Sequence, residues 1–186
     1  MDSKLQIISG RFKGRKLALP PQARPTQNRA RIALFNMLDS IGVDGVGDFM
    51  VWDAFAGSGA FGLECVSRFP NARVLFTDVA VSSINTIKKN LGQLNVGTNA
   101  TVLMADALNV VEKYAKDADI IFLDPPYSQS DLGVAIVNKL KNLVKKDAII
   151  IWEQDGPNVV MPNDEYWEIL RDKKYGRARF LIMQRI

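Results

Sequence analysis

One short segment of the sequence, Asp124-Pro125-Pro126-Tyr127, closes the strand-like apolar run DIIFL with a carboxylate, two prolines and an aromatic ring. Proline lacks an N–H and pushes the residue before it into extended geometry, so this segment presents only hydrogen-bond acceptors on a stiff backbone. The complementary ligand is a flat group that carries an NH₂, such as the exocyclic amino group of a nucleobase, with its ring stacked on Tyr127. A turn with a surface tyrosine is the competing interpretation.

Three further aspartates end or follow strand-like runs: Asp53, Asp78 and Asp106. Ligands of open α/β sheets bind at the carboxyl ends of the strands. Any one of these aspartates could be an ordinary helix N-cap. Together with Asp124 they predict a carboxylate-lined site along one edge of a sheet.

The glycine-rich turn GSGAFG, at residues 57–62, matches the dinucleotide fingerprint G-x-G-x-x-G, and Asp78 follows at a suitable distance. However, a carboxylate at Asp53 would repel a pyrophosphate and attract a cationic cofactor. S-adenosylmethionine carries a sulfonium and an ammonium and has no phosphate. We therefore expect Asp53 near its amino-acid end, Asp78 at the ribose hydroxyls and Asp106 at the adenine amino group.

The elements that must position these residues alternate between strand and helix from Phe49 onward. Such alternation implies parallel β-α-β units with helices on both faces of the sheet. The last segment, residues 166–186, instead predicts a terminal antiparallel hairpin about YGRA. The predicted strands are 49–55, 72–78, 100–106, 119–124 and 147–154, and the predicted helices are 60–69, 80–94, 107–116 and 132–144.

The N-terminal part has a different character. Residues 5–19 predict a short β-hairpin, and a helix follows, with Thr26 as its N-cap and with Ile32, Phe35 and Leu38 at helical spacing. We divide the chain into an extension, 1–42, and a catalytic domain, 43–186. Basic residues crowd the extension, which predicts contact with a polyanion, although a solvated basic arm is the alternative. The candidate contacts are Arg11, Lys13, Arg15, Lys16, Arg24, Arg29 and Arg31.

The amino-acid composition excludes several classes of catalytic and metal site. The chain of 186 residues has a net charge of +4 and no histidine, which excludes Ser-His-Asp hydrolysis and His-based zinc sites, and we expect no metal. No apolar run reaches the ~18 residues of a membrane span, and the N-terminus lacks an apolar signal-peptide core, so we expect a cytoplasmic protein. Cys65 is the single cysteine of the sequence, so no internal disulfide can form. We expect it to be buried, and likewise Trp52 and Trp152.

The motifs together resemble class I S-adenosylmethionine-dependent methyltransferases that act on amino groups. DAFAGSGAFGLE, Asp78, Asp106 and DPPY carry this resemblance, and ISGRFKGRKL followed by RPTQNRARIALFNML is similar to the opening of the bacterial 16S ribosomal RNA guanine-N2 methyltransferase family. The resemblance implies a Rossmann-like seven-stranded sheet. It also implies a product, N2-methylguanosine in small-subunit RNA, and as partner ribosomal RNA, either free or within an assembling subunit. The chain departs from the family pattern at Asn28, Ile32 and Ala80.

The resemblance also completes the expected site. Asp124 and the Pro125 carbonyl would orient the guanine amino group for in-line attack on the cofactor methyl. The catalytic candidates are Asp124, Pro125, Pro126 and Tyr127, and the cofactor-binding candidates are Asp53, Phe55, Ala56, Gly57, Ser58, Gly59, Asp78, Val79, Asp106 and Ala107.

Three alternatives stay open from the sequence. A dinucleotide-dependent oxidoreductase fits the glycines but leaves DPPY and the basic arm unexplained. A methyltransferase for DNA adenine or protein glutamine shares the site but not the N-terminal resemblance. A catalytically silent RNA-binding protein would not need the row of carboxylates.

Overall fold

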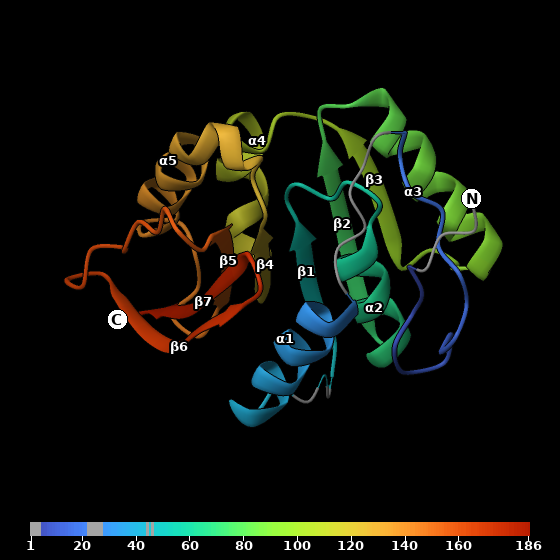
Figure 1. The fold of residues 1–186 in the computed structure, drawn as a ribbon, viewed down its shortest axis with the longest axis horizontal. Helices are drawn as coiled ribbons and strands as arrows, with labels where there is room; N and C mark the ends of the chain where they lie inside the picture. The colour runs from blue at the N-terminus through green and yellow to red at the C-terminus, as the bar shows by residue number, and fades with distance from the viewer. Residues whose placement is uncertain (1–4, 22–27, 44, 46) are drawn as a thin grey trace.

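A single mixed sheet organises the part of the chain that the computed structural model describes, residues 5–21, 28–43, 45 and 47–186 (Figure 1). The strands are β1 Phe49–Asp53, β2 Ala72–Asp78, β3 Ala100–Met104, β4 Ile120–Leu123, β5 Ile149–Asp155, β6 Trp167–Tyr175 and β7 Ala178–Arg185. The helices are α1 Asn28–Ser40, α2 Ala60–Arg68, α3 Val81–Leu94, α4 Ala107–Tyr114 and α5 Ser130–Leu140, with short 3₁₀ turns η1 Ala115–Asp117 and η2 Tyr127–Gln129.

The strand order is β3-β2-β1-β4-β5-β7-β6. Strands β1 to β5 pair in parallel, whereas β7 runs antiparallel to both β5 and β6. The prediction of a Rossmann-like, mostly parallel seven-stranded sheet with a terminal hairpin is therefore confirmed. The order reverses between β1 and β4, and such a switch point is where open α/β sheets bind their ligands.

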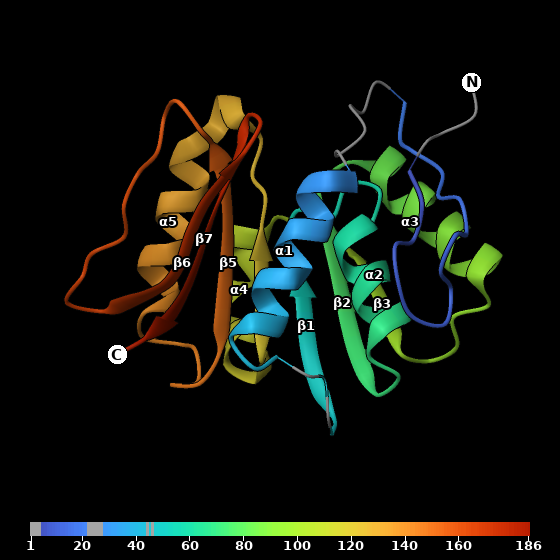
Figure 2. The ribbon, with the colours of Figure 1, turned by 60° about the horizontal axis from the view of Figure 1, so that its bottom comes forward.

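Helices cover both faces of the sheet (Figure 2). On one face α1, α2 and α3 pack through Leu34, Phe61 and Ile87, and on the other α4 and α5 pack through Val111 and Ile136. The expected burial of three further residues is confirmed, for Cys65, Trp52 and Trp152. No helix of the described part is both long and apolar enough to cross a bilayer.

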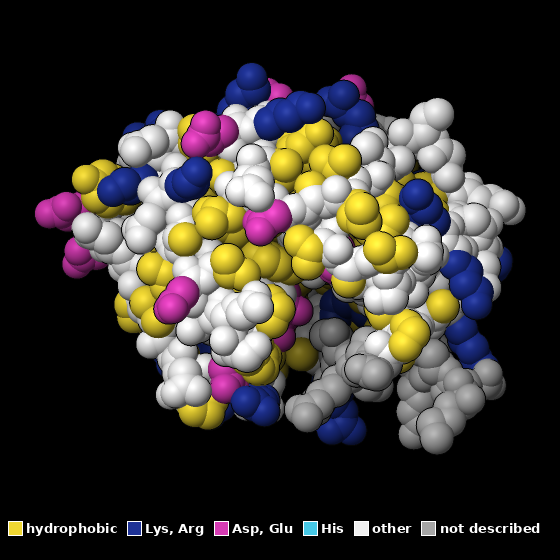
Figure 3. Space-filling model, turned by 90° about the horizontal axis from the view of Figure 1, so that it is seen from above, with side chains coloured by type: hydrophobic (Ala, Val, Ile, Leu, Met, Phe, Trp, Pro, Cys, Tyr) yellow, Lys and Arg dark blue, Asp and Glu magenta, His cyan; other side chains and the backbone are white. Residues whose placement is uncertain are grey.

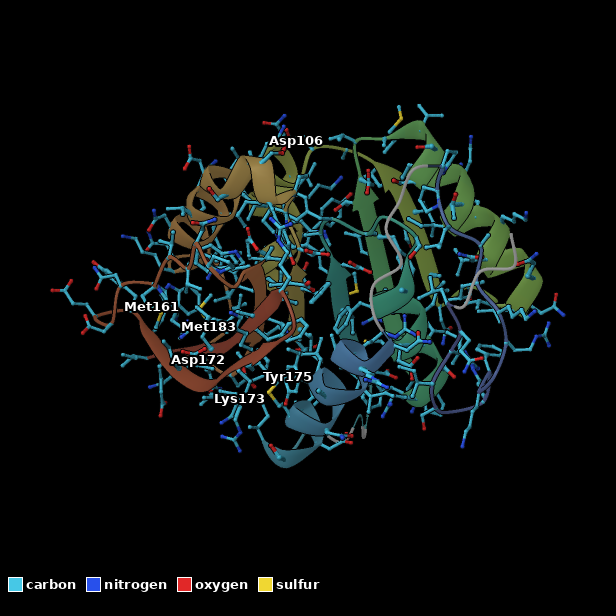
Figure 4. All side chains as sticks on the ribbon, in the orientation of Figure 1. Asp106, Met161, Asp172, Lys173, Tyr175 and Met183 are labelled. Atoms are coloured by element: carbon cyan, nitrogen blue, oxygen red, sulfur yellow. The ribbon has the colours of Figure 1, made fainter. Side chains whose placement is uncertain are left out.

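An ion pair helps to stabilise the β6–β7 hairpin at the far edge of the sheet. Arg179 on β7 binds the Asp172 carboxylate on β6 through two hydrogen bonds, of 2.6 and 2.5 Å. Asp172, Lys173 and Tyr175 lie along β6, well away from Asp106 at the top of the molecule (Figure 4). The hairpin thus extends the sheet on the side opposite β3.

The N-terminal segment is less regular than predicted. Residues 5–19 form one antiparallel bridge, Gln6 with Lys16, in place of two regular strands. Hydrogen bonds to the neighbouring helical layer attach this segment to the domain. The Glu64 carboxylate on α2 accepts hydrogen bonds from the N–H groups of Ile8, at 2.8 Å, and Ser9, at 2.9 Å.

Helix α1 differs from its prediction in one respect. Phe35 and Leu38 are buried, as their spacing predicts, but Ile32 is 40% exposed. The expectation that Ile32 shares the apolar stripe was wrong because the helix turns its neighbour Arg31 inward instead. The predicted N-cap, Thr26, lies outside the described residues.

Candidate active site

The glycine-rich turn after β1 is built around Asp53. This carboxylate is 1% exposed, and its Oδ2 accepts a hydrogen bond from the N–H of Gly62, at 3.0 Å. Gly57 and Gly59 have φ values of 53° and 77°, in the left-handed region that favours glycine. A Cβ on Gly57 would meet no atom within 4 Å, so the turn leaves open space beside its backbone.

Asp78, at the end of β2, holds the same turn from the other side. Its Oδ2 accepts from the N–H of Gly57, at 2.8 Å, and its Oδ1 from the N–H of Ala80, at 2.8 Å. Asp106 follows β3 and is the N-cap of α4, with Oδ1 accepting from Leu108 N at 2.8 Å. Both aspartates therefore have structural roles, and a carboxylate oxygen with two lone pairs can still accept from a ligand.

The predicted site residues line two adjoining cavities at this edge of the sheet. The larger, here called the rim cavity, has a volume of about 370 Å³. None of the described residues that line it is basic, and it joins the ends of β1, β2, β3 and β4. Its predicted lining residues are Phe55, Gly57, Asp78, Val79, Asp106, Ala107, Asp124, Pro125, Pro126 and Tyr127.

The smaller space, here called the inner cavity, has a volume of about 180 Å³ and shares Phe55, Gly57 and Asp124 with the rim cavity. Its other predicted lining residues are Asp53, Ala56, Ser58 and Arg31. Gly59 lines neither cavity and serves as the left-handed N-cap of α2. Apart from Gly59, the structure brings every predicted catalytic and cofactor residue to one of the two cavities.

A second acidic residue, Glu153 on β5, stands beside the catalytic candidates. Sheet pairing places Leu123 opposite Trp152, so Glu153 follows on β5 at the level of Asp124. Glu153 is 6% exposed and lines the inner cavity, and its Oε1 accepts a hydrogen bond from the Tyr127 hydroxyl, at 3.3 Å. The Arg177 guanidinium, itself paired with Asp155, lies 5.2 Å from the centre of the Tyr127 ring.

Burial, with neighbouring charges at Asp53 and Asp124, raises the proton affinity of these carboxyl groups. Burial raises the pKa of Asp53 to about 7, against the hydrogen bond from Gly62, and the charge of Asp78 adds to the increase. Burial also raises the pKa of Glu153 to about 7, although the Tyr127 hydrogen bond lowers it. Enclosure, followed by the charges of Glu153 and Asp53, raises the pKa of Asp124. The site thus concentrates carboxyl groups whose ionised form a cationic ligand would stabilise.

The predicted RNA-binding residues divide into two groups. Arg11, Lys13, Arg15, Lys16 and Arg29 are exposed. Arg24 lies outside the described residues. Arg31 departs from the expectation, because its side chain is 3% exposed and lines the inner cavity.

Seen from above, onto the edge where the parallel strands end, hydrophobic side chains and a few carboxylates occupy the centre of the face (Figure 3). Lys and Arg lie mostly toward the outline of the molecule in this view. The exposed Lys and Arg side chains thus surround this central region (Figure 3).

Sequence reasoning missed Glu153 and Glu64. Each is an acidic residue next to apolar residues of a core-forming element, WEQ on β5 and GLEC on α2. A charge that interrupts a core-forming pattern was the available signal, because such residues are rarely buried without a partner. Among the described residues, no group of three or more Cys, Asp or Glu side chains is arranged to hold a metal ion.

A family model described as conserved hypothetical protein 95 matches residues 5–184, which is nearly the whole chain. The chain belongs to this family. One of its relatives is the Escherichia coli (strain K12) protein named ribosomal RNA small subunit methyltransferase D. That protein is 35% identical over 187 residues, which cover 98% of this chain and 90% of the relative.

Two further comparisons agree with this family membership. A Buchnera aphidicola (subsp. Acyrthosiphon pisum) protein of the same name is 34% identical over 178 residues, covering 92% of this chain and 88% of the relative. The solved structure of the putative methyltransferase yhhF from Escherichia coli has a TM-score of 0.79 and 32% identity, with 98% of each chain covered. The resemblance to the ribosomal RNA methyltransferase family inferred from the sequence is confirmed.

Proposed function

We propose that this protein transfers a methyl group from S-adenosylmethionine to the exocyclic N2 amino group of a guanine in 16S ribosomal RNA. The names of its relatives support methyl transfer to small-subunit RNA and disfavour the oxidoreductase alternative. The observation that carries the proposal is the position of Asp124, which lines both the carboxylate-lined rim cavity and the inner cavity, with Tyr127 beside it in the rim cavity.

The residues present fit this cofactor. Asp53 Oδ1 is buried and has no hydrogen-bond donor among the described residues, so it can receive the ammonium group of the cofactor. Asp78 and Asp106 line the rim cavity and can accept from the ribose hydroxyls and the adenine amino group, between Val79 and Ala107. A cavity lined by acidic and apolar groups suits a cation better than a pyrophosphate. When bound, the cofactor supplies an electrophilic methyl group on sulfur.

Asp124 and the Pro125 carbonyl orient the nucleophile. The amino lone pair of guanine is delocalised into the ring, so N2 reacts poorly unless its two N–H groups are held by acceptors beside the methyl group. Positioning of this kind can contribute up to ~7–11 kcal/mol when the reacting atoms lie about 3–3.5 Å apart. Asp124, whose pKa is raised by its enclosure, then accepts the proton that N2 loses.

The position of Glu153 beside Asp124 favours guanine over adenine as the target base. Guanine presents the N1–H donor next to the N2 amino group, whereas adenine presents the N1 acceptor next to its N6 amino group. A second carboxylate beside Asp124 complements the donor pair of guanine and repels the lone pair of adenine N1. The Tyr127 ring, which Arg177 flanks on one side, offers a face on which the extruded base can stack, worth ~1–3 kcal/mol.

The basic surface supports RNA as the larger partner. We assign residues 1–42 to an RNA-binding extension and 43–186 to the methyltransferase domain, acting in the cytoplasm on ribosomal RNA, either free or within an assembling subunit. The exposed Arg11, Lys13 and Arg15 would contact phosphates, which position a substrate without reading its sequence.

An Asp124→Ala variant tests the proposal. Single-turnover assays with S-adenosylmethionine and unmethylated 16S ribosomal RNA should show loss of methyl transfer, while calorimetry shows retained cofactor affinity. Asp131→Ala, which removes an exposed carboxylate on α5, is the matched control and should behave as wild type. Identification of N2-methylguanosine in the wild-type product checks the target atom. Methylation of adenine or of protein glutamine instead, or wild-type rates for Asp124→Ala, would overturn the assignment.

A further inference from the structure

Arg31 is an arginine inside the protein. Its side chain is 3% exposed and lines the inner cavity from α1, although the sequence gives it the appearance of a surface residue. One nitrogen, Nη2, donates hydrogen bonds to the Gln6 carbonyl and to Asn28 Oδ1, the latter at 3.2 Å. Nε lies 3.8 Å from Glu64 Oε2, an ion pair without a hydrogen bond. The guanidinium is thus held in place from one side.

Two nitrogens of this guanidinium are unused as hydrogen-bond donors. Nε and Nη1 are buried and have no hydrogen-bond acceptor among the residues that the structure describes. A buried donor without an acceptor is costly, and native proteins rarely keep one without a reason. Nη1 carries two N–H groups and can donate a charge-assisted hydrogen bond to a carboxylate, which the positive charge of the guanidinium also attracts.

A second unused polar atom, of opposite charge, lines the same cavity. Asp53 Oδ1 is buried and has no donor among the described residues, while Oδ2 is occupied by Gly62. The inner cavity therefore offers one cationic and one anionic group whose hydrogen-bonding atoms are unused, Arg31 and Asp53. Most of the remaining wall is apolar and includes Leu34, Phe61 and Phe122. This pattern complements a small zwitterion attached to a short hydrocarbon chain.

We propose that Arg31 binds the α-carboxylate of S-adenosylmethionine while Asp53 binds its α-ammonium, so that the N-terminal segment completes the cofactor site. This inference rests on the proposed function, since it assigns a part of the same cofactor. The inner cavity joins the rim cavity at Phe55, Gly57 and Asp124, which gives the amino-acid end a path from the adenosine pocket. The other charged groups that line the inner cavity in the described part of the chain, Asp53, Asp124 and Glu153, are acidic and would repel a carboxylate, so Arg31 is the charged group there that can receive it.

Calorimetry with truncated ligands tests this role on the full chain. Decarboxylated S-adenosylmethionine keeps the sulfonium and the ammonium and lacks only the carboxylate. Wild-type protein should bind S-adenosylmethionine on the order of 10- to 100-fold more tightly than the decarboxylated compound, as expected for a charge-assisted hydrogen bond. In Arg31→Met this preference should disappear: affinity for S-adenosylmethionine falls, and affinity for the decarboxylated compound changes by less than about twofold. Arg73→Met, at an exposed arginine on β2, is the control and should retain the preference.

Each outcome has a distinct meaning. If wild-type protein binds the two compounds equally, or if Arg31→Met weakens both alike, Arg31 has only a structural role and the inference fails. If wild-type protein binds neither compound, the proposed function itself fails. Should Arg31→Met unfold, Arg31→Gln removes the charge but keeps a polar side chain, and a reduced preference in that variant would support the assignment while an unchanged one would overturn it.

Discussion

The hydroxyl of Tyr127 donates a hydrogen bond to Oε1 of Glu153, at 3.3 Å, and so links the turn after β4 to the end of β5. The interaction joins the proposed stacking platform to the proposed guanine-reading carboxylate. It also lowers the pKa of Glu153, which burial otherwise raises to about 7. Aromatic stacking and proton affinity at this site are therefore coupled through one side chain.

Substitutions at Tyr127 should separate these two contributions. Tyr127→Phe keeps the ring but removes the hydrogen bond, so the pKa of Glu153 rises further and the acidic limb of the pH–rate profile moves to higher pH. Above that limb the rate should stay close to wild type. Tyr127→Ala loses the stacking surface as well and should weaken productive RNA binding by ~1–3 kcal/mol. Single-turnover rates on both variants, measured from mildly acidic to mildly alkaline pH, report the effect, and an unmoved profile for Tyr127→Phe would disprove the coupling.

Cofactor binding should release protons near neutral pH. Asp53 has a pKa raised to about 7, and a bound cation favours the ionised form, so binding lowers this pKa. Affinity should therefore increase as pH rises from about 6 to about 8 and then level off. Calorimetry near neutral pH in buffers with different ionisation enthalpies measures the protons released. Binding that takes up protons, or affinity that falls with pH, would contradict the prediction.

Asp53→Asn provides the matched variant for the same group. The carboxyl binds its proton more tightly in the folded than in the unfolded state, so its contribution to stability is complete at low pH. That contribution is lost as pH rises from about 4 to about 7. At mildly alkaline pH the unliganded Asp53→Asn protein should consequently melt at a higher temperature than wild type, and in acid, where the wild-type carboxyl is protonated, the difference should vanish. The same variant should bind S-adenosylmethionine less tightly and release fewer protons.

Neutralising the exposed basic residues should affect RNA and spare the cofactor. In a Lys13/Arg15/Lys16→Ala variant, affinity for all RNA sequences should fall alike, and the dependence of log affinity on log salt should flatten by about 0.7–0.9 for each phosphate that the protein no longer neutralises. Cofactor affinity should not change, because these side chains line neither cavity. Lys113/Lys116/Lys146→Ala removes three exposed charges elsewhere and serves as the control. Unchanged RNA affinity and normal methylation at physiological salt would exclude this surface as the RNA-binding site.

The sequence by itself determined the architecture and most of the carboxylate rim. Strand and helix patterns alternate locally, and parallel strands bring their carboxyl ends to one edge whatever their order in the sheet. Asp53, Asp78, Asp106 and Asp124 could therefore be assigned to one site from their positions after strand-like runs. The glycine-rich turn could also be predicted from the sequence, because the positive φ values at Gly57 and Gly59 favour glycine.

Only the tertiary structure decided which other charges join that site. The strand order places β5 beside β4, and this brings Glu153 next to Asp124 across a sequence separation that carries no local signal. In α1 the pattern favoured an inward Ile32 and an outward Arg31, yet Arg31 is 3% and Ile32 40% exposed. A buried guanidinium is stable there because Gln6 and Glu64, from two distant segments, meet around it. Such compensation depends on packing between elements, which hydrophobic periodicity within one element cannot reveal.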